Sequence, residues 1–152
     1  MKIMFQLALA ASCTLALAAQ AVAADKGTAA EAVALVQKAG AFLKANGKEK
    51  AYAEFNNPAG SFKDRDLYII VYDLKGVNAA HGANPKMIGK DLIDLKDADG
   101  VPIVRNFIEL ANTKGKGWVD YKWPNPVSKA IEAKSTYIEK HGDVLIGAGI
   151  YK

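Results

Sequence analysis

The spacing of apolar residues predicts an amphipathic helix over residues 28–44. Apolar side chains recur there every three or four positions and form one stripe: Ala32, Val33, Val36, Ala39 and Leu43. Thr28 followed by Glu31 makes a capping box, which marks the start of the helix. The Asn-Gly pair at 46–47 ends it. Residues 48–55 then predict a second, shorter helix.

Five later segments are rich in β-branched and aromatic residues, which predicts strands. They are residues 67–72, 77–81, 118–123, 133–140 and 144–151. Short turns join neighbouring strands and indicate antiparallel pairing. A long irregular segment (82–100) and an amphipathic helix (101–114) separate the second strand from the third. Because helices and strands are grouped apart, the pattern indicates an α+β fold with an antiparallel sheet.

The last predicted strand has two very different faces, because alternate residues of a strand point to the same side. Val144, Ile146, Ala148 and Ile150 form an apolar face, which we expect to pack in the core. Gly147 and Gly149 lie on the other face with Leu145 and Tyr151. Glycine inside a strand usually marks a close approach by another group. That group is either a ligand or a large aromatic side chain such as Trp118 or Trp123.

Residues 1–24 carry one charge, on Lys2, followed by an uncharged run of apolar and small residues. A basic start, an apolar centre and Ala-Val-Ala at 21–23 predict a signal peptide that is cleaved after Ala23 or Ala24. The run is also long enough to span a bilayer, so an uncleaved anchor is the alternative. We expect one periplasmic domain over residues 25–152. Without Lys2, Lys plus Arg falls from 20 to 19 against 16 acidic residues, a net charge of +3.

The scarcity of cysteine and histidine excludes several classes of functional site. A single Cys (Cys13) and two His (His81 and His141) exclude a disulfide framework, a Cys/His zinc site and c-type haem attachment. The acidic run 94–100 does not fit the register of a calcium loop. No serine or cysteine nucleophile has a recognisable context, so we expect neither an enzyme nor a metal or other cofactor. The lysines are scattered, which argues against nucleic-acid binding.

Aromatic residues with a polar end are frequent in the predicted strands. A Tyr or Trp side chain supplies an apolar body and a hydrogen-bond donor, which suits a small binding pocket. The candidates are Tyr68, Trp118, Tyr121, Trp123 and Tyr137. Packing within the sheet is the alternative for each of them.

Several segments, in order, resemble a known family. They are DRDLYIIVYDLKGVNAAHGANPKMIGKDLIDLKDADG, GWVDYKWPNP, KSTYIEKHGD and IGAGIYK. From Gly27 to Lys152 the chain resembles single Cache domains of the second type, which are extracytoplasmic sensor modules. The resemblance implies a PAS-like fold, with a long N-terminal helix and a five-stranded antiparallel sheet covered by loops and short helices. It also implies a ligand pocket between the sheet and residues 82–117, and short-chain carboxylates as ligands.

The resemblance and the residues together lead us to expect reversible binding of a small organic anion, most simply a monocarboxylate. Lys134, which opens the KSTY motif, or Arg105 would pair with the carboxylate. The expected donors are Tyr68, Tyr121 and Tyr137, the expected pocket walls are His81, Trp118 and Trp123, and Gly147 would leave room for the ligand.

The expected partners follow from the same family. Its members are mostly the periplasmic parts of chemoreceptors and sensor kinases, whereas this sequence stops at Lys152, directly after the last predicted strand. Signalling by this chain alone is therefore in doubt, and we expect it to act with the periplasmic face of such a receptor. The alternative is an interaction protein with a vestigial pocket, which docks on a receptor or forms a homodimer through the helix at 28–44.

Overall fold

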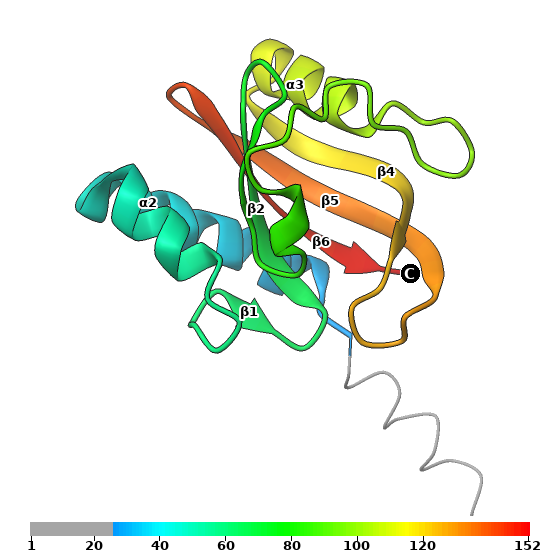
Figure 1. Cartoon of the computed structure of the whole chain (residues 1–152), viewed down its shortest axis with the longest axis horizontal. Coiled ribbons are helices and arrows are strands. Elements are labelled where there is room, and N and C mark those ends of the chain that lie inside the picture. Colours follow the sequence, from blue (N-terminus) through cyan, green and yellow to red (C-terminus); the bar gives the residue numbers. More distant parts are fainter. Residues whose placement is uncertain (1–25) are drawn as a thin grey trace, which may run out of the picture.

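The computed structural model describes residues 26–152, and the predicted signal peptide lies outside this range. A long helix covers one face of an antiparallel sheet, and a shorter helix with a long loop covers the other (Figure 1). The helices are α2 (Ala29–Phe55), the 3-10 helix η1 (Pro85–Met87) and α3 (Ile103–Thr113). Within residues 26–152, no helix combines the length and the apolar character needed to cross a membrane.

All strands of the sheet pair antiparallel, as predicted. The order is β1-β2-β6-β5-β4, and β3 pairs with the other side of β2. The strands are β1 (Lys63–Asp64), β2 (Leu67–Asp73), β3 (Asn78–His81), β4 (Lys116–Pro124), β5 (Ile131–His141) and β6 (Val144–Tyr151). The five predicted strands are confirmed, and the two-residue β1 is an addition that the sequence pattern did not indicate.

Helix α2 begins where the sequence predicts, and it bends at the position where the sequence predicts an end. The Thr28 hydroxyl accepts the Glu31 N–H at 3.3 Å, and the Glu31 carboxylate accepts the Thr28 N–H at 2.8 Å, which completes the capping box. Gly47 interrupts the helix with φ 78° and ψ 169°, a conformation that glycine adopts without steric cost. The two predicted helices are therefore the two arms of one bent helix.

The sheet separates two hydrophobic cores. Ile69 and Val71 of β2 point toward α2, whereas Tyr68, Ile70 and Tyr72 point toward α3. Both sets are buried, which confirms that β2 is covered on both faces. The predicted core face of β6 also packs against α2, through Val144, Ile146 and Ala148. The α3 core contains most of the polar aromatic residues and is the place where the candidate site forms.

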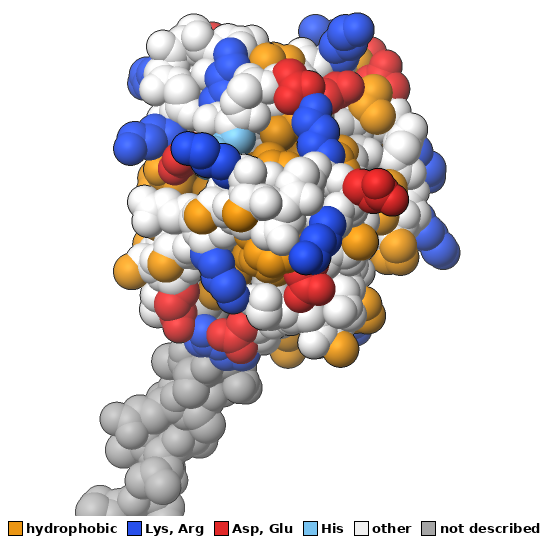
Figure 2. Space-filling view, turned by 90° about the vertical axis from the view of Figure 1, so that its left-hand side faces the viewer, with side chains coloured by type: hydrophobic (Ala, Val, Ile, Leu, Met, Phe, Trp, Pro, Cys, Tyr) orange, Lys and Arg blue, Asp and Glu red, His pale blue; other side chains and the backbone are white. Residues whose placement is uncertain are grey.

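Positively and negatively charged side chains are intermixed on the face formed by the bend of α2 and the β5–β6 turn. Lys and Arg side chains alternate there with Asp and Glu, and apolar side chains lie between them (Figure 2). Charge of both signs on this face agrees with the scattered lysines of the sequence.

Candidate functional site

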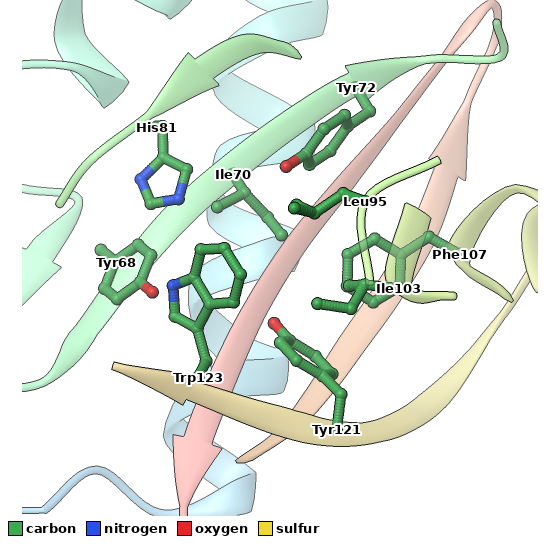
Figure 3. Close-up of a pocket in the computed structure, with 9 residues that line it drawn as sticks. All are labelled: Tyr68, Ile70, Tyr72, His81, Leu95, Ile103, Phe107, Tyr121 and Trp123. Atoms are coloured by element: carbon green, nitrogen blue, oxygen red, sulfur yellow. The ribbon is translucent and has the colours of Figure 1, made fainter. Parts of the chain in front are cut away.

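A small pocket lies between the sheet and the covering segment formed by the 82–102 loop and α3. Its cavity measures about 10 Å³, the space of about one water molecule. Its walls are mostly apolar or aromatic, with a few polar atoms, as in small-molecule sites. The lining residues are Tyr68, Ile70, Tyr72, His81, Leu95, Ile103, Phe107, Tyr121 and Trp123 (Figure 3).

A larger cleft adjoins this pocket on the outside. It measures about 220 Å³ and shares Tyr68, His81 and Trp123 with the inner pocket. The loop between β4 and β5 and the segment after β3 complete the lining of the outer cleft. Its other lining residues are Ala83, Asn84, Pro124, Asn125, Pro126 and Lys129. The three shared side chains therefore form the wall between the inner chamber and the outer cleft.

A lysine is buried directly behind this wall. Lys134 is 3% exposed, and its Nζ donates hydrogen bonds to the hydroxyls of Tyr68 at 2.6 Å and Tyr151 at 3.2 Å. The ammonium also lies 4.1 Å and 4.5 Å from the centres of these two rings. The negative charge of Asp66 acts on Lys134, but among residues 26–152 no carboxylate makes an ion pair with it. A buried cation surrounded by neutral groups attracts an anion.

Burial shifts the pKa values of the ionisable side chains in the site. Loss of solvent lowers the pKa of Lys134 to about 7, and the Asp66 carboxylate opposes this shift. Burial and then the charge of Lys134 lower the pKa of His81 to about 3, so His81 is neutral at physiological pH. Burial raises the pKa of Tyr68 and of Tyr121 well above 10, so both keep their protons.

The hydrogen bonds of the neutral His81 ring show which of its nitrogens carries the proton. Its Nδ1 accepts the backbone N–H groups of Ala83 at 3.3 Å and Asn84 at 3.0 Å. These contacts assign the single ring proton to Nε2. The His81 ring stacks on Tyr68 with 5.2 Å between ring centres. Figure 3 shows the Trp123 indole nitrogen beside the Tyr68 hydroxyl, so the wall carries hydrogen-bond donors from three residues.

The hydroxyl protons can be assigned in the same way. Tyr151 donates its proton to the Pro124 carbonyl at 2.9 Å, which leaves its oxygen to accept from Lys134. Tyr68 accepts from Lys134 and has one proton of its own, which it gives to Tyr151 at 3.2 Å or to a group in the pocket. Polarisation by the ammonium strengthens Tyr68 as a donor. The site can therefore bind an anion with charge-assisted hydrogen bonds.

The structure brings together five of the residues that the sequence singled out. Tyr68, His81, Tyr121 and Trp123 line the inner pocket, and Lys134 lies behind it. Tyr121 already has a partner, since its hydroxyl is 2.8 Å from that of Thr136.

Three other candidates lie elsewhere. Trp118 and Tyr137 pack together at 5.4 Å between ring centres, and Tyr137 belongs to the core on the α2 side of the sheet. The Arg105 side chain is 57% exposed and makes an ion pair with Asp94 at 2.5 Å. The structure does not bring these three side chains to the pocket, and our proposals leave them out.

The glycines of β6 make room for protein side chains. A Cβ on Gly147 would lie 2.6 Å from Cδ1 of Ile138, and one on Gly149 would lie 2.3 Å from Oγ1 of Thr136 and 2.5 Å from Cε of Lys134. The expectation that Gly147 leaves space for the ligand is therefore corrected. Close packing explains both glycines, but the closest packed groups come from β5 rather than from a tryptophan. Gly149 in particular allows the Lys134 side chain to cross β6.

Gly149→Ala is expected to destabilise the protein by about 1–3 kcal/mol, because the new methyl group overlaps Thr136 and Lys134. Gly147→Ala is the matched control, since its shortest contact is with the flexible end of Ile138. We expect the smaller loss there. Denaturant unfolding of both variants measures the difference, and equal stability of Gly149→Ala and the unchanged protein would contradict the packing argument.

Sequence reasoning missed some pocket residues. Tyr151 shares the glycine face of β6, so strand alternation already pointed to it, although it was not counted among the ligand groups. The apolar wall formed by Leu95, Ile103 and Phe107 comes from an irregular segment and from α3. Irregular segments have no periodic pattern that shows which side chains point inward, so no local signal identified Leu95.

Comparison with known proteins agrees with this geometry. A family model described as Single Cache domain 2 matches residues 16–152. The chain belongs to this family. A solved structure described as the structural basis for carboxylic acid recognition by a Cache chemosensory domain is 25% identical, with a TM-score of 0.68 over 91% of this chain and 99% of that one.

Two curated relatives are receptors. This Cache domain is 36% identical over 90 residues to the methyl-accepting chemotaxis protein McpP of Pseudomonas putida, a match that covers 58% of this chain and 16% of that protein. It is 30% identical over 89 residues to the sensor histidine kinase MctS of Rhizobium johnstonii, covering 57% and 19%. The chain thus matches less than a fifth of either relative. It is a Cache sensor domain that resembles those of chemoreceptors and sensor kinases.

Proposed function

We propose that this Cache domain binds short-chain monocarboxylates reversibly in the periplasm, without catalysis. The observation that carries the proposal is the buried Lys134 ammonium, whose protein partners are the neutral hydroxyls of Tyr68 and Tyr151. A bound carboxylate would supply the ion-pair partner that this cation lacks among residues 26–152. The solved Cache domain described as recognising carboxylic acid supports the same ligand class.

The geometry suggests how the ligand is held. The carboxylate accepts hydrogen bonds from the Tyr68 hydroxyl and from Nε2 of His81, while Lys134 stabilises the charge from behind Tyr68. The short aliphatic tail lies in the apolar chamber against Ile70 and Ile103. Since the cavity is small, side chains must shift by a short distance on binding. Every contact is noncovalent, so release reverses binding.

The partner of this domain belongs to the same proposal. We infer that it acts at the periplasmic face of a chemoreceptor or sensor kinase, in agreement with its two curated relatives. A homodimer through the exposed face of α2 is a further element of the proposal. One observation favours a second function, an interaction module with a vestigial pocket, because the inner cavity holds about one water molecule.

A thermal-shift screen separates the two functions. Acetate, propionate, butyrate, pyruvate and lactate are added to the purified protein at saturating concentration. A ligand at 100 times its Kd stabilises the folded state by about 2.7 kcal/mol, which raises the melting temperature by about 5–10 °C for a domain of this size. Amines and chloride serve as controls. A shift with amines and none with any carboxylate would refute carboxylate binding, whereas no shift with any of the compounds would favour the interaction module.

A further inference from the structure

The wall between the inner chamber and the outer cleft has one member that is only half-buried. Tyr68 and His81 are 2% and 4% exposed and stack on each other. Lys134 holds the Tyr68 hydroxyl, and the His81 backbone N–H donates to Asn56 at 2.8 Å. Trp123 is half-buried on β4, the edge strand of the sheet, one residue before the strand ends at Pro124.

The surroundings differ on the two sides of this tryptophan. On the inner side, Leu95, Ile103 and Phe107 close a chamber of about 10 Å³. On the outer side, the cleft of about 220 Å³ is open to larger groups. The Trp123 ring meets Tyr121 edge-on at 6.2 Å between ring centres, and Figure 3 shows it standing between Tyr68 and the apolar wall. Removing this one ring would join the two spaces.

We propose that Trp123 sets the upper limit on the chain length of the carboxylates that bind. The inference rests on the proposed function. With Trp123 in place, the acyl tail is confined to the inner chamber, so a longer tail has no space. Without the ring, the tail extends from the Tyr68 and His81 donors into the outer cleft. Each methylene that becomes buried improves affinity by about fourfold, so the preference reverses in favour of longer chains.

Calorimetric titration of the full chain with acetate, propionate, butyrate and hexanoate tests this. We expect the unchanged protein to bind propionate and to bind hexanoate at least tenfold more weakly. Trp123→Ala is expected to bind hexanoate at least tenfold more tightly than the unchanged protein does. Trp123→Phe keeps a ring in the wall and should retain the short-chain preference. Trp118→Ala, on the other face of β4, is the matched control and should not change the order of affinities.

The outcomes separate the inference from the function on which it rests. If no carboxylate binds the unchanged protein, the proposed function fails, and the inference with it. If propionate binds but Trp123→Ala keeps the short-chain order, the function stands and the role of Trp123 is refuted. Equal affinity of the unchanged protein for propionate and hexanoate also refutes it. Trp123→Leu, which keeps an apolar side chain at the edge strand, replaces the alanine variant if that variant does not fold.

Discussion

Lys134→Met is expected to weaken the binding of propionate by about 100-fold. Methionine keeps the length and apolar stem of lysine but removes the charge and both donated hydrogen bonds. The Lys134 charge attracts the carboxylate from behind Tyr68. A lost attraction of about 2.8 kcal/mol, within the range for opposite charges a few ångströms apart in a protein, is a hundredfold loss of affinity. Isothermal titration of the unchanged protein and the variant measures the loss directly.

We expect the Lys134→Met substitution not to lower the stability of the fold. A loss of binding in this variant can therefore not be attributed to unfolding. A buried cation without a carboxylate partner is costly, and an apolar replacement of similar volume is often neutral or stabilising. The pKa of Lys134 is lowered to about 7 in the folded state, so the unfolded chain binds more protons between pH 7 and about 10.4. The stability of the unchanged protein relative to Lys134→Met therefore rises across this range.

Arg105→Met tests the other cationic candidate in the same titration. Arg105 is exposed and paired with Asp94, so we expect its replacement to leave the affinity for propionate unchanged within twofold. If Lys134→Met binds propionate as tightly as the unchanged protein, the buried ammonium is not the anchor. A loss confined to Arg105→Met would show that the anchor lies on α3 instead.

The affinity for carboxylates is expected to fall as the pH rises above about 7. Free Lys134 has a pKa lowered to about 7 by burial, and a bound carboxylate favours its charged form. The pKa of Lys134 is therefore higher in the complex, and binding takes up a proton above pH 7. The affinity should be nearly constant between pH 6 and 7 and then fall toward tenfold per pH unit. His81, with its pKa near 3, stays neutral across this range.

Titrations at pH 6, 7, 8 and 9 in two buffers with different ionisation enthalpies measure both the affinity and the proton uptake. Lys134→Met provides the control, because its residual binding should lose the dependence on pH. Affinity that increases with pH, or binding at pH 8 without proton uptake, would be inconsistent with a titrating Lys134. The tyrosines do not contribute, since burial raises the pKa of Tyr68 and Tyr151.

Strand alternation already separated some candidates that sequence analysis had grouped together. Trp118 and Tyr121 are an odd number of positions apart in one strand, and so are Lys134 and Tyr137. The two side chains of each pair must therefore point to opposite faces of the sheet. The structure has this arrangement: Tyr137 is in the α2 core and Tyr121 in the α3 core. A stricter use of the period-two rule would have removed Trp118 and Tyr137 from any site that includes Lys134.

Alternation could not decide which face of the sheet carries the pocket. β2 is apolar on both sides, because a helix or a loop covers each of them. The exposure of Arg105 depends on a pairing with Asp94 from an irregular loop, for which the sequence has no periodic signal. Gly147 and Gly149 correctly indicated close packing, but the side chains that fill the space come from a neighbouring strand.

The sequence by itself determined most elements of this protein, since the capping box, the glycine at position 47 and the β-branched segments act over a few residues, whereas the sequence pattern did not indicate the short elements β1 and η1. The resemblance of its ordered motifs added the family, which the comparison confirms. Only the tertiary structure placed Lys134 against Tyr68 and Tyr151, residues 66 and 17 positions away in the chain. That contact depends on the pairing of β2, β6 and β5, and the burial that lowers the pKa of Lys134 arises only when both layers cover the sheet.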